Sequence, residues 1–396
     1  MRNSFAFSKP HAISLLLPHL RGDGAVRMMM TLAAGFHADG YRVDLLVANS
    51  RGAYSKAIPN GIRLIDLHEK TPTRALFGLV RYLRRERPSV LMASEHYSGL
   101  PALYALKLSR LHAHCVIRQD NTWGMDSARF KGLQRIITPR MVPRVFRAAD
   151  IIAVSHGVAR DLISHFPHLR NNTSVIYNPV ISPDLIAKSR APLDHPWFRP
   201  SEPPVCVAIG RLAHAKGFDL LIEAFARVVG QVAARLLILG EGPERTRLEA
   251  QIASLQMEGV CRLEGYCPNP YPFLHNANVF VLSSRFEGLP TVLIEALAVG
   301  APVIATDCPS GPREILADGR YGTLVAPEDP EQLATAILEH LRHPAPAASD
   351  LGDWLHQFDV DASVRKHIEL IEAVMANPPP NVRNAPLPLH SAAAPR

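Results

Sequence analysis

Short runs of consecutive apolar residues alternate with longer segments of helical periodicity along most of the chain. A short apolar run between turn residues is typical of a buried strand, and apolar positions three and four apart indicate an amphipathic helix. The strands predicted in the first half are 13–18, 41–48, 62–67, 89–94, 114–119, 150–155 and 173–180. The helices predicted there are 24–40, 73–88, 99–111, 143–149 and 156–166. This β-α-β alternation predicts a parallel sheet with helices on both faces.

The alternation breaks at 182–204, which is rich in proline and polar residues and indicates an interdomain linker. It then resumes. The strands predicted after the linker are 205–210, 234–240, 260–265, 279–284, 302–306 and 322–327. The helices predicted there are 219–229, 243–255, 269–277, 290–299, 311–317 and 330–342. We expect a final helical region at 353–376, whereas 377–396 lacks the apolar periodicity needed to pack and is typical of a disordered tail.

These patterns predict two doubly wound α/β domains, 1–180 and 181–345, with the region 353–376 returning to the first. A chain of 396 residues suits two or three domains at roughly 100–200 residues each. Ligands of doubly wound sheets bind beyond the carboxyl ends of the strands. We therefore expect a cleft between the domains and the chemistry in loops that follow strands.

Five scattered cysteines without a C-x-x-C pair favour reduced thiols over a disulfide framework and show no metal-ligand spacing. The apolar stretch 12–20 is followed by a charged turn rather than a small-residue cleavage site, so we interpret it as a buried strand and not a signal peptide. No run reaches the ~20 apolar residues of a transmembrane helix. We therefore expect a cytoplasmic location.

Charge is unevenly distributed along the chain. Residues 1–180 contain 25 Lys and Arg against 11 Asp and Glu, whereas residues 181–396 contain 18 against 25. A basic half favours an anionic partner such as lipid headgroups, lipid-linked pyrophosphate or nucleic acid, and solvated Arg on helix faces is the alternative. Basic amphipathic segments at 74–88 and 129–147 suit peripheral contact with the inner face of an anionic membrane. No nucleic-acid-binding module is recognisable, so we expect no nucleic acid partner.

Two cations and two glycines occupy the predicted strand-to-helix turn after 205–210: Gly210, Arg211, Lys216 and Gly217. Glycines let the backbone approach a ligand closely. Arg offers a planar fork of donors and Lys a point charge, which together suit a diphosphate. A basic surface turn is the alternative.

Two carboxylates, Glu287 and Glu295, lie in an otherwise apolar segment. Pro290 suits the first helical position and Gly300 the C′ stop, which places Glu287 in the loop before a helix and Glu295 inside it. Backbone N–H groups at a helix start form an anion site, and Glu295 can hold vicinal hydroxyls. The alternatives are a helix-dipole residue for Glu287 and an exposed helix residue for Glu295. The apolar neighbours of Glu295 nevertheless require a partner for its carboxylate.

Five motifs follow one another in the second half. They are G-R-L with K-G at 210–217, L-L-I-L-G-E-G-P at 236–243, E-x7-E at 287–295, D-C-P-S-G-P-R-E-I-L at 307–316 and Y-G-T-L-V at 321–325. Their order and spacing resemble the C-terminal domain of retaining glycosyltransferases of family 4, which have the GT-B fold. The resemblance covers roughly 205–338, with weaker similarity in the first half. The final helical region resembles the closing helix of that family.

The resemblance implies a role for each matching residue. Arg211 and Lys216 match the pair that neutralises the donor diphosphate, so no metal cofactor is expected. Glu287 matches the residue beside the donor sugar, and Glu295 the residue that holds the ribose hydroxyls. The backbone contacts to sugar and phosphate fall on Gly288, Leu289, Pro290 and Thr291. The family usually has E-G-F-G here, and Pro290 lacks one expected backbone donor.

Two glycines, Gly22 and Gly24, lie at the first strand-to-helix turn of the chain. The resemblance implies that this turn brings backbone N–H groups close to the donor phosphate and the acceptor. A plain tight turn is the alternative.

The resemblance places the acceptor side in the first domain. Ser94 occupies the position at which some family members carry a catalytic histidine, and His96 follows two residues later. A loop histidine near the cleft is the alternative for His96. Asp120 and Asn121 follow a predicted strand and are candidates for contact with the acceptor hydroxyl, or ordinary turn residues.

The sequence therefore predicts a retaining hexosyltransferase. It would move a hexose or N-acetylhexosamine from a nucleotide-diphosphate sugar, which we expect to be a UDP-sugar, to a hydroxyl of a glycan or lipid-linked acceptor. The expected setting is the assembly of cell-surface polysaccharide, lipopolysaccharide or glycolipid. One alternative is a nucleotide-sugar epimerase or hydrolase on the same fold, for which we find no clear proton-abstracting set. The other is a non-catalytic nucleotide-sugar-binding protein, against which the intact Arg211, Lys216, Glu287 and Glu295 argue.

Overall fold

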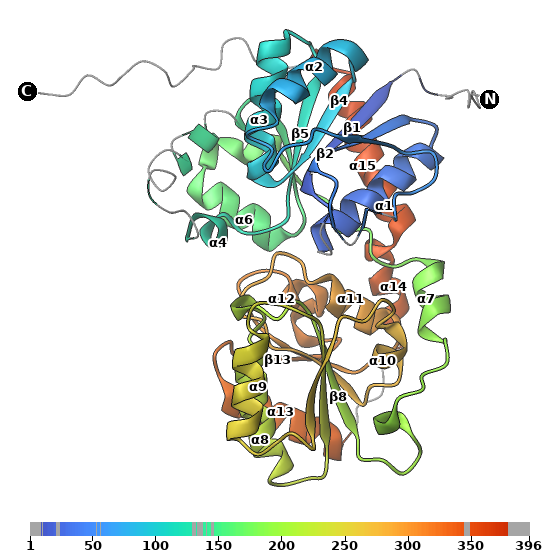
Figure 1. Ribbon diagram of the computed structural model, residues 1–396, viewed down its shortest axis with the longest axis vertical. Helices are drawn as coiled ribbons and strands as arrows, with labels where there is room; N and C mark the ends of the chain where they lie inside the picture. The colour runs from blue at the N-terminus through green and yellow to red at the C-terminus, as the bar shows by residue number, and fades with distance from the viewer. Residues whose placement is uncertain are drawn as a thin grey trace, which may run out of the picture. The chain divides into compact units, whose positions relative to one another are not determined.

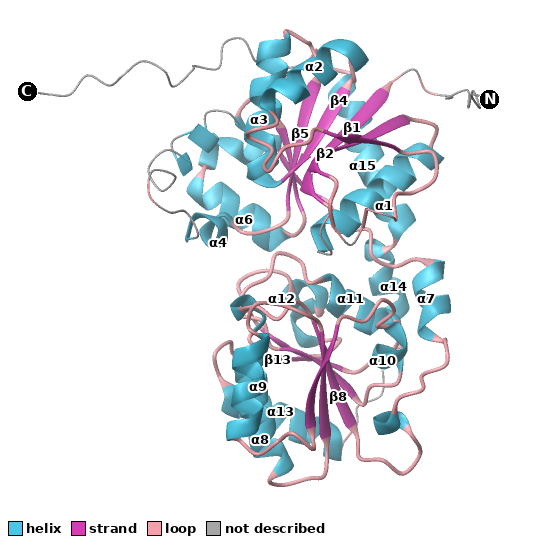
Figure 2. Cartoon of the chain, in the orientation of Figure 1, coloured by secondary structure: helices cyan, strands magenta, loops and turns pink. Residues whose placement is uncertain are grey.

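The computed structural model describes residues 9, 11–20, 24–52, 54–55, 57–128, 132, 138–139, 141–143, 146–343 and 349–378. The chain divides into two compact units, Met1–Pro179 with Val360–Arg396 and Val180–Asp359 (Figure 1). Each unit contains one parallel sheet with helices packed on it (Figure 2). The predicted fold class, two doubly wound α/β domains, is confirmed.

The first unit is built on a seven-stranded sheet with the order β3-β2-β1-β4-β5-β6-β7. Its strands are β1 (Ala12–His19), β2 (Arg42–Asn49), β3 (Arg63–Asp66), β4 (Val90–Ser94), β5 (His114–Gln119), β6 (Asp150–Ala153) and β7 (Thr173–Val175). Its helices include α1 (Gly24–Ala38), α2 (Leu76–Glu86), α3 (Glu95–Ser109), α4 (Trp123–Ala128), α6 (His156–His165), η1 (Pro167–Asn172) and α15 (Val360–Met375). The strand order reverses between β1 and β4, which are neighbours.

Helix α15 joins the first unit although it comes last in the described chain. Its residues Val364, Ile368 and Ile371 lie in the same apolar core as β1 and α1, and Figure 1 shows α15 beside α1. The approach to α1 is close, because a Cβ added at Gly35 would lie 2.5 Å from a methyl carbon of Val364. Glycine at this position lets the two helices pack against each other.

The second unit is built on a six-stranded sheet with the order β10-β9-β8-β11-β12-β13. Its strands are β8 (Val205–Ile209), β9 (Arg235–Leu239), β10 (Cys261–Gly265), β11 (Val279–Leu282), β12 (Val303–Thr306) and β13 (Thr323–Val325). Its α-helices include α7 (Pro183–Ser189), α8 (Phe218–Val229), α9 (Arg245–Ser254), α10 (Tyr271–His275), α11 (Thr291–Ala298), α12 (Pro312–Ile315), α13 (Pro330–Arg342) and α14 (Leu351–Leu355). Its 3-10 helices include η2 (Pro196–Phe198), η3 (His214–Lys216), η4 (Ala317–Gly319) and η5 (His356–Phe358). The order reverses between β8 and β11, which makes this pair the topological switch point.

The predicted linker 182–204 is ordered structure of the second unit. Helix α7 starts after Ser182, whose side chain accepts a hydrogen bond from the N–H of Leu185 at 3.2 Å. Further on, Trp197 is buried, with the guanidinium groups of Arg235 and Arg262 each 5.1 Å from its ring centroid. The proline-rich composition suggested a flexible spacer. Composition alone does not reveal these packing partners, because they lie far away in the sequence.

Other boundaries also differ from the prediction. Helix α3 begins at Glu95 rather than at residue 99, and α14 and η5 belong to the second unit, so only α15 returns to the first. Gly22, most of 129–147 and the tail from residue 379 lie outside the described residues. Within the described ranges, no helix is both long and apolar enough to cross a membrane.

Candidate active site

The switch point of the second sheet joins two motifs that lie 71 residues apart in the chain. Strands β8 and β11 are neighbours, so the loops after them meet at one edge of the sheet. There Lys216 Nζ donates a hydrogen bond to Glu287 Oε1 at 2.6 Å, and Ser284 Oγ donates to the same oxygen at 2.6 Å. The side chain of Lys216 is 25% exposed and that of Glu287 is 10% exposed. The structure thus brings two predicted site residues into direct contact and leaves the pair open on one side.

The loop that carries Lys216 depends on a glycine. Gly217 has φ = +61°, and a Cβ added there would lie 2.1 Å from the carbonyl oxygen of Ser283. Ser283 Oγ also donates to the carbonyl oxygen of Lys216 at 2.9 Å. The backbone of this loop is therefore pressed against the end of β11, as only glycine permits.

Gly210 and Arg211 begin the same loop. The backbone around Gly210 is crowded, because a Cβ added at Gly240, after β9, would lie 1.9 Å from the carbonyl oxygen of Gly210. A Cβ added at Gly242 would likewise lie 2.2 Å from the carbonyl oxygen of Leu212.

Arg211 is exposed and makes no hydrogen bond or ion pair to another described residue. Its guanidinium is therefore available to a ligand at this edge of the sheet.

Helix α11 starts one residue later than predicted. Pro290 is its N-cap, with φ = −68° and ψ = 99°, and Thr291 is the first helical residue. A Cβ at Gly311 would lie 2.5 Å from Pro290 Cδ, and Ser310 Oγ donates to the carbonyl oxygen of Gly288 at 2.8 Å. The loop after β12 therefore supports the segment before the helix. Placing Pro290 at the first helical position was wrong, since its ψ is extended.

Gly300 and Glu295 lie as the sequence pattern indicates: Gly300 follows the end of helix α11, and Glu295 is buried within the helix. Gly300 has φ = +81° and follows the C-cap Val299, so the predicted C′ stop is confirmed. Glu295 is only 3% exposed, and the exposed-residue alternative for it is wrong. Leu289 is also buried. A buried carboxylate in the second turn of α11 is costly unless it is paired, which is typical of a functional position.

Cys308 lies close to the Lys216–Glu287 pair. Burial, followed by the negative charge of Glu287, raises the pKa of its thiol to about 12. The group therefore remains a neutral thiol at physiological pH. We assign it no role as a nucleophile or a ligand.

Sequence reasoning missed one charged residue in this site, Arg285. Its side chain is 7% exposed and binds Asp219, at the start of α8, through two hydrogen bonds of 2.7 and 3.0 Å. The two residues are 66 positions apart in the chain, so no local pattern links them. The only sequence signal is an arginine two residues before Glu287.

In the first unit, three predicted residues lie at the carboxyl ends of β4 and β5. Ser94 Oγ donates to Asp120 Oδ2 at 3.5 Å, and Asp120 Oδ1 accepts a hydrogen bond from the fully buried Arg118. Asn121 Nδ2 donates to Glu95 Oε1 at 2.5 Å. Since β4 adjoins β1 at the reversal of the strand order, Gly24 begins α1 at the same edge of the sheet. Ser94, Asp120 and Asn121 thus share one hydrogen-bonded region of this unit.

His96 lies in the first turn of α3 and not in a loop. It is 1% exposed, its Nδ1 is 3.4 Å from Asp126 Oδ2, and its ring centroid is 5.4 Å from that of Trp123. The loop-histidine alternative is therefore wrong. Because the ring is enclosed by its own unit, we do not assign it to proton transfer.

Glu95 is a second residue that the sequence did not reveal. Its φ is +57°, in the left-handed region that costs a non-glycine residue about 1 kcal/mol or more. Strain of this kind, beyond the carboxyl end of a strand, is common at functional sites. No sequence pattern signals it, because glutamate has no preference for positive φ.

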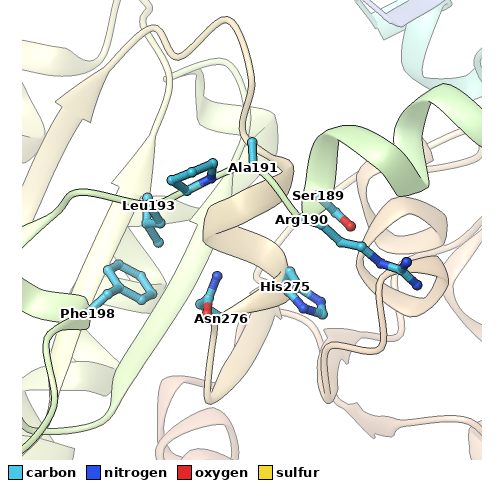
Figure 3. A pocket seen from close by; sticks show the side chains of 8 residues that line it. Ser189, Arg190, Ala191, Leu193, Phe198, His275 and Asn276 are labelled. Atoms are coloured by element: carbon cyan, nitrogen blue, oxygen red, sulfur yellow. The ribbon is translucent and has the colours of Figure 1, made fainter.

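A cavity of about 300 Å³ lies elsewhere in the second unit. Figure 3 shows Arg190, which follows α7, and His275 and Asn276, at the end of α10, among the side chains that line it. Its lining contains none of the residues predicted for the site, and we assign it no part in the reaction. Across the described residues, no group of three or more His, Cys, Asp or Glu side chains is arranged to hold a metal ion.

Comparisons with known proteins match both halves of the chain. The family model for glycosyl transferases group 1 matches residues 190–353, and the model for glycosyltransferase family 4 matches residues 22–181. The lipopolysaccharide core biosynthesis glycosyltransferase LpsE of Rhizobium meliloti is 31% identical over 326 residues, which cover 80% of this chain and 85% of that protein.

A second relative is similar over a shorter stretch. The N-acetylgalactosamine-N,N'-diacetylbacillosaminyl-diphospho-undecaprenol 4-alpha-N-acetylgalactosaminyltransferase of Campylobacter jejuni is 32% identical over 191 residues, 48% of this chain and 50% of that protein. Among solved structures, HepE of Anabaena in complex with UDP and glucose matches with a TM-score of 0.75 and 19% identity. The match covers 92% of this chain and 100% of that one, and it shows the shared fold.

Proposed function

The chain belongs to glycosyltransferase family 4, the glycosyl transferases group 1, and from this membership we propose a specific transfer reaction. In this proposal the enzyme moves a hexose or N-acetylhexosamine from a nucleotide-diphosphate sugar, a UDP-sugar, to an acceptor hydroxyl with retention of configuration. The observation that carries the proposal is the contact between Lys216 and Glu287 at the switch point of the second sheet. It places a cation and a carboxylate where such sheets bind ligands.

Each side chain has a separate task in this reaction. Lys216 and Arg211 neutralise the diphosphate as it leaves, together with the positive end of the α11 dipole. Glu287, oriented by Lys216 and Ser284, accepts hydrogen bonds from the donor sugar. Glu295 holds the ribose hydroxyls. The bond between the anomeric carbon and the diphosphate oxygen breaks, the acceptor oxygen bonds to that carbon on the same face, and the acceptor proton passes to the leaving diphosphate.

The names of similar proteins support the choice of donor and acceptor. HepE was solved with UDP and glucose, and the Campylobacter jejuni relative is named for a diphospho-undecaprenol acceptor. LpsE is named for lipopolysaccharide core biosynthesis. We therefore place this enzyme in the assembly of cell-surface polysaccharide, lipopolysaccharide or glycolipid, with a glycan or lipid-linked acceptor on the side of Ser94, Asp120 and Asn121.

A panel of UDP- and GDP-sugars tests the proposal. We expect release of UDP from at least one UDP-sugar, increased by lipid extract that supplies acceptor, and an anomeric configuration in the product that matches the donor. Release should be equal in excess EDTA, because Lys216 and Arg211 supply the charge that a divalent cation supplies elsewhere. Tight binding of donors without release from any of them would contradict a transferase. Loss of release in EDTA that Mg²⁺ restores would contradict the metal-free mechanism.

The outer face of α2 favours an anionic membrane as a further partner of the enzyme. Phe77 is 77% exposed, and Arg81 and Arg85, four and eight residues later on the same side of the helix, are exposed as well. The opposite face is buried in the core of the unit. An apolar side chain among arginines suits the boundary between headgroups and acyl chains of an anionic bilayer. We place the enzyme in the cytoplasm, peripheral on the inner face of the cell membrane, where a lipid-linked acceptor would be within reach.

Replacing Arg81 and Arg85 together by alanine is expected to weaken binding to phosphatidylglycerol vesicles about 30-fold. Each arginine near an anionic surface contributes about 1 kcal/mol, and 1.4 kcal/mol corresponds to a tenfold change. Vesicle co-sedimentation at low salt measures the effect. The matched control replaces Arg160 and Arg170, which are exposed on α6 and η1 of the same unit. Equal weakening by the two double variants would indicate a general charge effect and contradict the α2 surface.

A further inference from the structure

Arg285 is enclosed in the second unit and uses most of its hydrogen-bonding capacity. Its Nε donates to Glu328 Oε1 at 2.6 Å. Its Nη1 donates to Asp219 Oδ1 at 2.7 Å and to the carbonyl oxygen of His214 at 3.0 Å, and its Nη2 donates to Asp219 Oδ2 at 3.0 Å. Four of the five N–H groups of the guanidinium are therefore engaged by the protein.

These contacts connect the segments on either side of Lys216. His214 lies two residues before Lys216 in η3, and Asp219 lies three residues after it in the first turn of α8. The backbone N–H of Arg285 also donates to the carbonyl oxygen of Ala215 at 2.8 Å. Arg285 is itself two residues before Glu287. Arg285 thus holds the segment 214–219 (the lysine loop) at both ends and ties it to the loop that carries Glu287.

The charge of Arg285 is balanced within this arrangement. Burial alone would raise the pKa of Asp219, but the hydrogen bonds and the charge of Arg285 lower it below its ordinary value. Asp219 is therefore ionised and pairs with the guanidinium as a two-pronged fork. With its donors occupied and its side chain 7% exposed, Arg285 is not a direct ligand of the diphosphate.

We propose that Arg285 is a positioning residue of the donor site that sets the contact between Lys216 and Glu287. The inference rests on the proposed function, because it assigns Arg285 to the neutralisation of the leaving diphosphate through Lys216. A lysine in its place would keep the charge but could not contact Asp219 through a fork and His214 at the same time. The lysine loop would then lose its fixed distance from Glu287.

Arg285→Lys is expected to lower kcat for nucleotide release about 30-fold while the KM for the donor changes less than about threefold. A small displacement of a charge that acts mainly in the transition state reduces kcat rather than ground-state binding. The control is Arg247→Lys, because Arg247 also contacts Asp219, at 3.3 Å, but is 54% exposed and extends from α9. We expect this control to stay within about twofold of the wild type. An equal loss in the control, an unchanged kcat in Arg285→Lys, or a loss confined to KM would overturn the proposal.

Hydrogen exchange separates this inference from the proposed function, because it needs no turnover. In Arg285→Lys we expect faster exchange in a peptide spanning 213–218 and unchanged exchange in the sheet of the second unit. Faster exchange throughout that unit would show a general structural role and overturn the proposal, as would unchanged exchange in 213–218. A wild type that releases nucleotide from no donor would refute the proposed transferase, while the exchange pattern would still decide whether Arg285 fixes the loop.

Discussion

Lys216→Ala is expected to lower kcat for sugar transfer about 100- to 1000-fold. The ammonium group lies 2.6 Å from Glu287 at the edge of the sheet where the diphosphate would depart, and it is the partly buried cation of the two predicted there. Removing one preorganised donor from a group that develops charge costs a factor of this size in other enzymes. The variant also leaves the charge of Glu287 without its cation, which repels the anionic donor. Steady-state nucleotide release with saturating donor measures the effect.

The matched control for this substitution is Lys188→Ala. Lys188 belongs to the same unit, is 54% exposed and pairs with Asp184 at 2.7 Å, one turn earlier on α7. An exposed pair of this type contributes little, so we expect turnover within about twofold of the wild type. A Lys216→Ala enzyme with more than about a third of wild-type kcat would contradict the assigned mechanism, whatever the value of the donor KM.

The sequence predicted the parts of the candidate site that depend on local chemistry. Gly300 ends α11 because a C′ glycine adopts positive φ, and a preference of this kind is visible in a short window of residues. Lys216 and Glu287 were predicted as site residues from their motifs. Their contact could not, because it depends on β8 and β11 becoming neighbours, and strand order is a property of the whole sheet.

The Arg285–Asp219 contact, the position of Pro290 and the backbone conformation of Glu95 were not predicted, because each depends on residues distant in the sequence. The Arg285–Asp219 fork joins residues 66 positions apart, and burial of an arginine is decided by what packs around it. Pro290 was predicted at the first helical position from a general preference, but contact with Gly311 holds it one position earlier. Glu95 adopts positive φ against its own preference, so the surrounding structure must impose it. Tertiary packing overrides local propensity at each of these positions.

Gly217→Ala is expected to lower the free energy of unfolding of the second unit by about 2–5 kcal/mol. An alanine at φ = +61° costs roughly 1–2 kcal/mol, and its Cβ would lie 2.1 Å from the carbonyl oxygen of Ser283. Neither backbone can yield without moving Lys216 or the end of β11, which adds a packing cost of about 1–3 kcal/mol. Denaturation followed by the fluorescence of Trp197 and Trp354, both in the second unit, measures the loss.

Gly300→Ala separates the two contributions, because Gly300 also has positive φ, +81°, but a Cβ added there meets no atom within 4 Å. This control should show the conformational cost alone, about 1–2 kcal/mol, and should leave kcat of the folded enzyme unchanged. Gly217→Ala should in addition reduce kcat of the fraction that remains folded, since relief of the clash displaces the neighbouring Lys216 from Glu287. Equal losses of stability in the two variants, with kcat intact in both, would show that the close approach of Gly217 to Ser283 is dispensable. A larger loss confined to Gly217→Ala would tie the stability of this turn to the geometry of the lysine that it carries.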